Sequence, residues 1–197
     1  MPVNLVILGL GNPGPNYEHS RHNVGHWFVN YLAELHQISF YAASSYQICS
    51  FPFAGGKLTL AKSVNYMNEN GLGVRKFLIN CKGEKDEFVI VHDELDLPIG
   101  RAKFSQRKSA AGHNGVSSVL NELDFSPPRL RIGIDAIRPR NFSPSEFVLS
   151  RFSSDELLCL DSLLPPFIES LRLCISRGLS FAMNYTNSYP LTKPASL

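Results

Sequence analysis

Apolar and polar positions along the chain follow two different periods, and the N-terminal part already predicts a strand followed by a helix. The run Leu5–Leu10 is continuously apolar and ends in glycines, which is typical of a central strand buried on both faces. After a loop over residues 11–22, apolar side chains recur at helical spacing from Val24 to Leu35. This spacing predicts an amphipathic helix that begins close to Asn23, so His22 lies at or just before a helix N-terminus.

The middle of the chain continues this alternation. Two short strands joined around Gly55-Gly56 are predicted, and a helix follows Asn68 with Val74, Phe77 and Leu78 on one face. The predicted strands are Tyr46–Phe53, Lys57–Lys62, Phe88–His92, Arg101–Ser105 and Leu130–Ile134, with a further helix over Asn114–Leu123. Because strands and helices alternate, we expect a single α/β domain with a twisted, mixed, mostly parallel sheet flanked by helices on both faces.

The C-terminal part is expected to be helical and then loosely ordered. Ser153 and Glu156 have the spacing of a capping box, which predicts the start of a helix. Pro165-Pro166 must interrupt that helix, and a second one should end near Gly178. We therefore expect one domain over residues 1–185 and a loosely held polar tail over residues 186–197.

Composition narrows the class of protein. With 197 residues, of which 44% are hydrophobic and 18% charged, the chain can bury one substantial core. Its four cysteines form no C-x-x-C pair, which favours buried, reduced thiols in an intracellular protein. The N-terminus leaves no room for a charged leader, and no apolar run reaches ~18 residues, so we expect a cytoplasmic protein without a membrane span. A mitochondrial location stays open.

Positive charge is concentrated in one part of the chain. Residues 97–140 contain eight Lys or Arg and three acidic residues, although the whole chain has a net charge of only +2. Such a stretch can contact a phosphate backbone, or it can be an ordinary solvated surface, and charge alone favours neither interpretation.

The glycine-rich segment Gly9–Gly14 matches the G-x-G-x-x-G fingerprint of dinucleotide-binding proteins. A dinucleotide site also needs a helix at the third glycine and an acidic residue some ~20 positions later. Instead, Pro13 and Pro15 crowd the turn, and Gln37–Tyr41 contains no acid. A nicotinamide-dependent oxidoreductase is therefore the weaker alternative.

Polar residues that could carry chemistry gather in four clusters at predicted ends of strands or starts of helices. These are Asn12 with His22 and Asn23, Tyr66–Asn68, His92–Asp96, and Gly112–Gly115. Each has a plain structural interpretation, because Asn and Asp commonly cap helices. A metal site formed by His19, His22 and His26 with Asp93, Glu94 and Asp96 is a further alternative, against which Gly25 and the late helix start argue.

Taken together and in this order, the four clusters resemble the bacterial-type peptidyl-tRNA hydrolase family. The residues that carry the resemblance are Gly9-Leu10-Gly11-Asn12-Pro13-Gly14, Tyr17, Arg21-His22-Asn23, Tyr66-Met67-Asn68, His92-Asp93-Glu94-Leu95-Asp96-Leu97-Pro98, Gly112-His113-Asn114-Gly115 and Leu130-Arg131-Ile132-Gly133-Ile134. The similarity extends from about residue 5 to residue 150 and becomes loose in the C-terminal helices.

The resemblance implies a monomeric hydrolase that cuts the ester bond between a peptide and the 3′ end of tRNA, without metal or cofactor. It implies that His22 is the general base, that Asp93 holds it, and that Asn12 completes the catalytic set and distinguishes a blocked from a free amino group. The implied contacts to substrate and tRNA are Tyr17, Tyr66, Asn68, His113, Asn114, Arg101, Lys103, Arg107, Lys108 and Arg131.

The sequence departs from the family pattern where the tRNA phosphates are expected to bind. Ser20 replaces the usual threonine, Ser105 stands where a lysine is frequent, and Lys108–Ala111 replaces a glycine-rich approach to His113. The positive charges that contact the phosphates are then expected to come from Arg107 and Lys108. A catalytically silent RNA-binding relative is the alternative from a different functional class.

Overall fold

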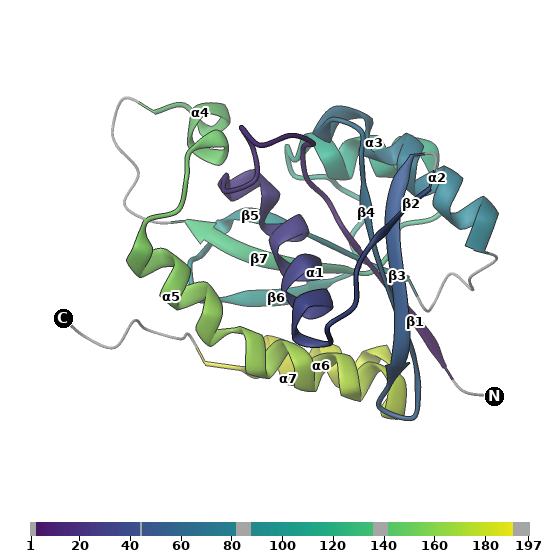
Figure 1. Ribbon diagram of the computed structural model, residues 1–197. Helices are drawn as coiled ribbons and strands as arrows, with labels where there is room; N and C mark the ends of the chain where they lie inside the picture. The colour runs from purple at the N-terminus through teal and green to yellow at the C-terminus, as the bar shows by residue number, and fades with distance from the viewer. Residues whose placement is uncertain (1–2, 44, 82–87, 136–141, 191–197) are drawn as a thin grey trace.

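A seven-stranded sheet runs through the centre of the computed structural model, which describes residues 3–43, 45–81, 88–135 and 142–190 (Figure 1). The strands are β1 (Asn4–Gly9), β2 (Tyr41–Ala43), β3 (Tyr46–Phe53), β4 (Gly56–Ser63), β5 (Phe88–Pro98), β6 (Ala102–Ser105) and β7 (Arg129–Asp135). Their order is β2-β3-β4-β1-β5-β7-β6. The central strands β4, β1, β5 and β7 pair in parallel, and the outer pairs are antiparallel. The expected mixed sheet is confirmed, with its parallel part confined to the centre.

Strand β1 is buried on both faces, as its apolar run predicts. Leu5 and Ile7 pack into one hydrophobic core, and Val6 and Leu8 pack into a second core on the opposite face of the sheet. Because successive side chains of a strand point to opposite faces, a continuous apolar run supplies both cores at once.

Helices cover both faces of the sheet. They are α1 (Val24–Leu35), α2 (Asn70–Cys81), α3 (Asn114–Glu122), α4 (Pro144–Leu149), α5 (Ser154–Ser162), α6 (Leu164–Arg177) and α7 (Leu179–Ser188), with 3₁₀ turns η1 (Arg21–Asn23) and η2 (Met67–Glu69). On one face, Phe28 of α1 meets Phe167 of α6 edge-on, with ring centroids 5.1 Å apart. On the other face, Phe77 of α2 and Val119 of α3 share the second core.

Several elements differ from those expected from the sequence. Strand β5 continues to Pro98, so the acidic cluster after His92 lies within a strand and not in the loop after it. Strand β2 and helices α4 and α7 were not predicted. Pro165-Pro166 interrupts the helix as expected, because the prolines occupy the first turn of α6, where the missing N–H groups need no partner.

Ordered structure continues past residue 185, where the loosely held tail is expected to begin. Helix α7 continues to Ser188, and Thr186 is buried with its hydroxyl 2.6 Å from that of Ser170. The carboxamide of Asn187 accepts a hydrogen bond from the N–H of Phe104 and donates one to its carbonyl. These contacts fix the start of the expected tail to β6, whereas residues 191–197 lie outside the described residues.

The thiols that the structure describes agree with the expectation of buried cysteines. Cys49, Cys159 and Cys174 are free and buried, and burial raises the pKa of Cys174 to about 12. No helix within the described ranges is both long and apolar enough to cross a membrane.

The start of α1 packs directly against the end of the sheet. A side chain at Gly25 would collide with the carbonyl oxygens of Leu10 and Val91, and one at Gly9 would collide with the backbone of Gly25. Glycine at both positions therefore allows α1 and the preceding turn η1 to lie against the carboxyl ends of β1 and β5. This close approach brings His22 above β5.

Candidate active site

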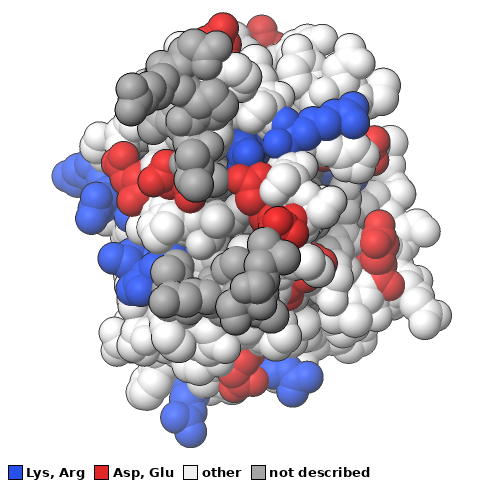
Figure 2. Space-filling model, turned by 90° about the vertical axis from the view of Figure 1, so that its left-hand side faces the viewer, with Lys and Arg blue, Asp and Glu red and all other residues white. Residues whose placement is uncertain are grey.

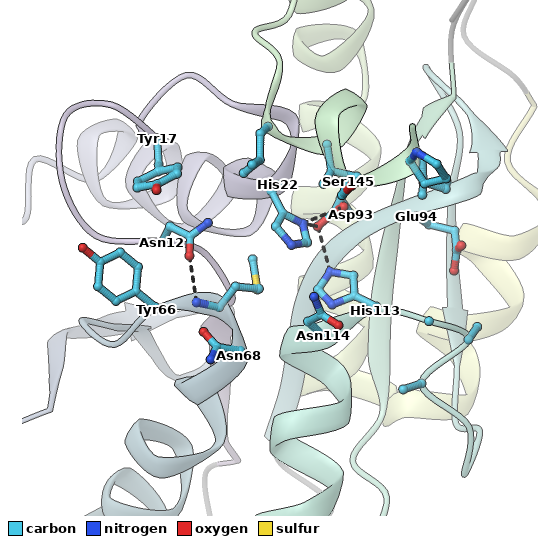
Figure 3. Close-up of a pocket in the computed structure, with 18 of the residues that line it drawn as sticks. Asn12, Tyr17, His22, Tyr66, Asn68, Asp93, Glu94, His113, Asn114 and Ser145 are labelled. Atoms are coloured by element: carbon cyan, nitrogen blue, oxygen red, sulfur yellow. Dashed lines mark hydrogen bonds and ion pairs between the residues drawn. The ribbon is translucent and has the colours of Figure 1, made fainter. Parts of the chain in front are cut away.

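A pocket of 750 Å³ opens at the carboxyl ends of the central parallel strands, where open α/β sheets commonly bind ligands (Figure 3). In Figure 3, Asn12, Tyr17, Tyr66 and Asn68 lie on one side of the pocket and His22, Asp93 and His113 on the other. Its walls come from the loop after β1, η1, η2, β5, the start of α3, and α4. Segments far apart in the sequence thus meet in one site, and all four predicted polar clusters contribute to it.

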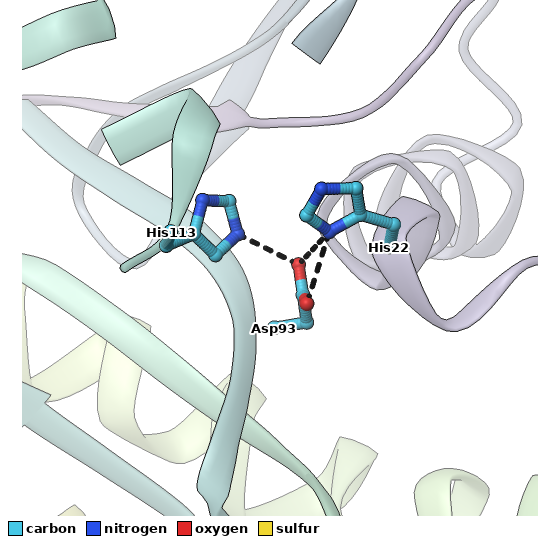
Figure 4. Close-up of side chains that lie close together, drawn as sticks. All are labelled: His22, Asp93 and His113. Atoms are coloured by element: carbon cyan, nitrogen blue, oxygen red, sulfur yellow. Dashed lines mark hydrogen bonds and ion pairs between the residues drawn. The ribbon is translucent and has the colours of Figure 1, made fainter. Parts of the chain in front are cut away.

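Two histidines converge on one buried carboxylate (Figure 4). The Nδ1 atom of His22 lies 2.9 Å from Oδ1 and 3.0 Å from Oδ2 of Asp93, which is 71 positions further along the chain. The Nε2 atom of His113 lies 2.8 Å from the same Oδ1 atom. The structure therefore brings the predicted pair His22 and Asp93 together and adds His113, expected only as a substrate contact, as a second partner of the carboxylate.

The hydrogen-bond pattern determines which ring nitrogens carry hydrogen. Burial alone would raise the pKa of Asp93, but the charges and hydrogen bonds of His113 and His22 outweigh burial and hold this pKa far below its ordinary value. The carboxylate is therefore ionised, and His22 donates its Nδ1–H to it. When the ring is neutral, the Nε2 atom of His22 then has a free lone pair. His113 is fixed separately, because its Nδ1 accepts the N–H of Val116 at 3.2 Å and its Nε2–H must then donate to Asp93.

This pattern also bears on metal binding. His22, Asp93 and His113 place one potential ligand atom each within 4.8 Å of one another. A metal needs a free lone pair on each imidazole nitrogen, yet both nitrogens facing Asp93 carry hydrogen here. Freeing Nε2 of His113 would place a hydrogen on Nδ1, against the N–H of Val116. As they are hydrogen-bonded here, these three side chains are therefore better suited to holding protons than to holding a metal ion. The other proposed cluster does not form, because His19 is exposed whereas His26 is buried.

The carboxamide of Asn12 has a fixed orientation. Its Oδ1 atom accepts the N–H of Met67 at 2.7 Å, so its Nδ2 atom is the group that is left to face the pocket. The backbone of Asn12 is held by Asn23, whose Oδ1 accepts the Asn12 N–H at 2.8 Å and whose Nδ2 donates to the Asn12 carbonyl at 2.9 Å. Asn12 consequently presents hydrogen-bond donors, and not acceptors, to a ligand.

A second carboxamide, which the sequence analysis did not single out, fastens the same loop. Asn70 is fully buried; its Oδ1 accepts the N–H of Gly11, and its Nδ2 donates to the carbonyls of Gly11, Asn65 and Tyr66. It therefore ties the loop after β1 to the loop before η2. The sequence gives no specific signal for this role, because an Asn at the start of a helix also fits a simple cap.

The remaining predicted substrate contacts line the pocket. Asn68 and Asn114 are exposed at its rim, where η2 and α3 begin. Tyr17 and Tyr66 meet edge-on at the mouth with ring centroids 6.3 Å apart, and Tyr66 is 54% exposed. One exposed ring, Tyr66, and one half-buried ring, Tyr17, are thus available to a flat or extended ligand.

The predicted tRNA contacts differ in their exposure and in their partners. Arg107 and Lys108 are exposed in the loop that leads to the pocket wall at Ala110 and Ala111, and Arg101 and Lys103 are half-buried around β6.

Arg131 differs from the expectation, because its Nε donates to Glu94 at 2.7 Å and its side chain is only 11% exposed. Arg138 and Arg140 of the basic stretch lie outside the described residues. Figure 2 shows one face on which basic groups are separate and acidic side chains lie between them.

Helix α4 forms a wall of the pocket that the sequence analysis missed. Pro144, Ser145, Val148 and Leu149 line this wall. The signal was present, since Ser143 and Glu146 form a capping box of the same kind as the predicted one at Ser153 and Glu156.

Two histidines near the site are buried and uncharged. His92 packs edge-on against His113, and burial lowers its pKa well below the ordinary value. His26 lies beside Gly11, and burial followed by the charge of Lys62 lowers its pKa to about 3. Both must take up a proton on unfolding in mildly acidic solution.

We therefore expect the protein to lose stability from about pH 6.5 downward, where an unfolded histidine begins to bind a proton. Folded His26 stays neutral to about pH 3. The unfolded state then binds more protons, and the free energy of unfolding should fall by about 2–3 kcal/mol from His26 alone between pH 6.5 and pH 4.5. Denaturant unfolding at several pH values measures this slope. His26→Phe should flatten it, and His19→Asn, an exposed control, should not; an unchanged slope in His26→Phe would contradict the assignment.

The sheet, the pocket at its edge and the buried imidazole–carboxylate pair are the features of an α/β enzyme with a histidine and a carboxylate in its active site. Comparison with known proteins shows to which family this enzyme belongs. A family model described as peptidyl-tRNA hydrolase matches residues 6–194. A peptidyl-tRNA hydrolase of Synechococcus sp. is 38% identical, with 96% of this chain and 85% of that protein covered. One of Fervidobacterium nodosum is 33% identical over 95% of this chain and 98% of that protein.

Solved structures agree with the sequence comparison. A crystal structure of peptidyl-tRNA hydrolase from Acinetobacter baumannii matches with a TM-score of 0.87 and 29% identity, covering 98% of each chain. The chain belongs to the peptidyl-tRNA hydrolase family. The nicotinamide alternative is not supported, because the glycine-rich loop leads into η1 and not into a helix at its third glycine.

Proposed function

We propose that this pocket hydrolyses the ester between a peptide and the 3′-terminal ribose of tRNA, with His22 as general base. The observation that carries the proposal is the contact of His22 Nδ1 with the buried, ionised Asp93, which leaves Nε2 free to accept a proton at the pocket surface. Removing a proton from water is the step for which an ester hydrolase needs such a group.

The proposed reaction uses three side chains. Nε2 of His22 takes a proton from water as the water oxygen bonds to the ester carbonyl carbon, and Asp93 stabilises the imidazolium that forms. The Nδ2 group of Asn12 donates to the oxygen that gains negative charge. When the intermediate collapses, the bond to the ribose oxygen breaks and that oxygen receives the proton from His22. The products are a free peptide carboxylic acid and tRNA.

The orientation of Asn12 supports selection of blocked substrates. Its Nδ2 donors can meet the carbonyl oxygens of a peptide-linked residue, but they repel a free α-ammonium group, which has only donors. Asn68 and Asn114 at the rim and the tyrosine pair at the mouth are proposed to hold the peptide and the tRNA end.

Contacts to the tRNA phosphates are proposed for Arg101, Lys103, Arg107 and Lys108. The exposed loop with Arg107 and Lys108 leads into the pocket wall, so a bound acceptor end would pass close to it. Arg131, held by Glu94, is proposed to position this region and not to be a free phosphate contact. We also propose that the chain acts as a cytoplasmic monomer; light scattering during size exclusion tests the monomer.

The deciding experiment offers the protein N-acetyl-aminoacyl-tRNA and unblocked aminoacyl-tRNA. We expect release of the acyl group from the blocked substrate and little release from the unblocked one. Binding of the blocked substrate without turnover would refute the hydrolase and support the catalytically silent RNA-binding relative.

The substitution Asn12→Asp should reduce discrimination between these substrates. Aspartate keeps an oxygen for the Met67 N–H but replaces the donor with a negative charge that attracts an α-ammonium. Hydrolysis of the blocked substrate should fall by roughly 10²–10³-fold. The ratio of kcat/KM values for blocked and unblocked substrates should fall by about 10-fold or more. Asn16→Asp, an exposed change in the same loop, is the matched control. An unchanged ratio in Asn12→Asp would contradict the assigned role.

A further inference from the structure

Arg21, the residue before the catalytic imidazole, directs its side chain to the junction of α4 and α5. Its Nε donates to the hydroxyl of Ser150 at 3.1 Å, and its Nη2 donates to Oε2 of Glu156 at 2.9 Å. The guanidinium carbon lies 4.4 Å from the ring centroid of Phe147 and 4.9 Å from that of Phe152. The side chains of Arg21 and Glu156 are only 8% and 14% exposed. A buried cation with this many directed contacts restrains the segments it joins.

Backbone contacts join the same two segments. The N–H of Arg21 donates to the carbonyl of Ser150 at 3.0 Å, and Ser20 forms an antiparallel bridge with Arg151. The turn η1 is therefore attached to the chain directly after α4. Since α4 supplies Ser145, Val148 and Leu149 to the pocket, this junction connects the turn that carries His22 to the α4 wall of the pocket.

Glu156 extends the connection to the next helix. Its Oε2 atom also accepts the N–H of Ser153 at 2.7 Å, as part of the capping box that starts α5. One carboxylate oxygen therefore holds both the helix cap and Arg21. Lysine has a single nitrogen and cannot reproduce the planar fork that reaches Ser150 and Glu156 while stacking between two rings.

We propose that Arg21 is a positioning residue for the hydrolysis: it fixes the distance between η1 and α4, so that His22 and the α4 wall face the same bound substrate. This role of Arg21 rests on the proposed function. It deepens that function, because a residue outside the pocket then determines how η1 and α4 are arranged. A displacement of about 1 Å at a reacting group can lower a rate by about 10²-fold.

The test compares Arg21→Lys and Glu156→Gln with Arg151→Lys, an exposed neighbouring control. We expect kcat/KM to fall by about 10–100-fold in the first two variants at temperatures where circular dichroism shows them folded. Amide hydrogen exchange should accelerate in residues 144–149 and 21–23 and stay unchanged in α2. Full activity and unchanged exchange in folded Arg21→Lys would overturn the proposal.

Chemical rescue provides a second readout, which tests whether the guanidinium group itself is needed at this junction. In Arg21→Ala, the space between Phe147 and Phe152 should accept a guanidinium ion, so millimolar guanidinium should restore part of the lost activity, whereas equal ammonium should not. If Arg21→Ala does not fold, the kcat/KM and the hydrogen exchange of Arg21→Lys decide whether the proposal holds. If the wild-type protein itself fails to hydrolyse blocked aminoacyl-tRNA, the proposed function fails, and hydrogen exchange still tests the connection between η1 and α4.

Discussion

Replacement of His22 with asparagine is expected to lower kcat by about 10²–10⁴-fold on N-acetyl-aminoacyl-tRNA. The asparagine Nδ2 can still donate to Asp93 in place of the imidazole Nδ1–H, so the fold around the carboxylate should survive. No atom of asparagine, however, can accept a proton at the position of Nε2. Single-turnover hydrolysis measures the chemical step directly, without a contribution from product release.

The control for this variant lies in the same loop. His19 is exposed, and His19→Asn should retain the wild-type rate. Binding of the blocked substrate, measured with the His22→Asn protein, should be nearly unchanged, because the base acts mainly in the transition state. If His22→Asn kept more than about a tenth of the wild-type kcat, water would have to be activated by another group.

The substitution Asp93→Asn is expected to have a comparable effect, on the order of 10³–10⁴-fold in kcat. The amide has nearly the same shape as the carboxylate, but its Nδ2 would meet the Nδ1–H or Nε2–H of an imidazole with a second donor. His22 can relieve this clash by moving its hydrogen from Nδ1 to Nε2, and it then presents a hydrogen to the pocket where the reaction needs a lone pair.

Two comparisons separate this explanation from simple destabilisation. The exposed change Asp161→Asn controls for the loss of one negative charge. In the double variant His22→Asn/Asp93→Asn, the loss should be close to that of the more damaging single variant, because both changes disable the same step. Losses that multiply in the double variant would show that the two residues act independently.

Much of the fold follows from local patterns, because β1 and α1 carry signals that do not depend on distant residues. The apolar run Leu5–Leu10 predicts a strand with two buried faces, and each face does contact its own core. The true end of β5 could not be predicted, because residues 93–98 contain three acids and a proline. These residues stay in a strand because β7 pairs alongside them, and that contact is non-local.

The candidate site was predictable in its components but not in its contacts. The motifs name His22, Asp93 and Asn12, yet no spacing shows that residues 71 positions apart meet. The partner of Arg131 could not be derived either, since Glu94 reaches it only through the pairing of β5 with β7. Asn23 and Asn70 went unassigned because their carboxamides bind the backbone of other loops, and such bonds have no sequence period.

The fixed amide of Asn12 has a consequence for inhibitor design. Because its oxygen is occupied by the Met67 N–H, compounds directed to this pocket should approach Asn12 with a carbonyl, sulfonyl or phosphoryl oxygen, and primary amines should be poor starting points. A compound that also places a hydroxyl beside His22 would mimic both the attacking water and the developing oxyanion. The tyrosine pair at the mouth offers aromatic faces on which a flat group could then be added.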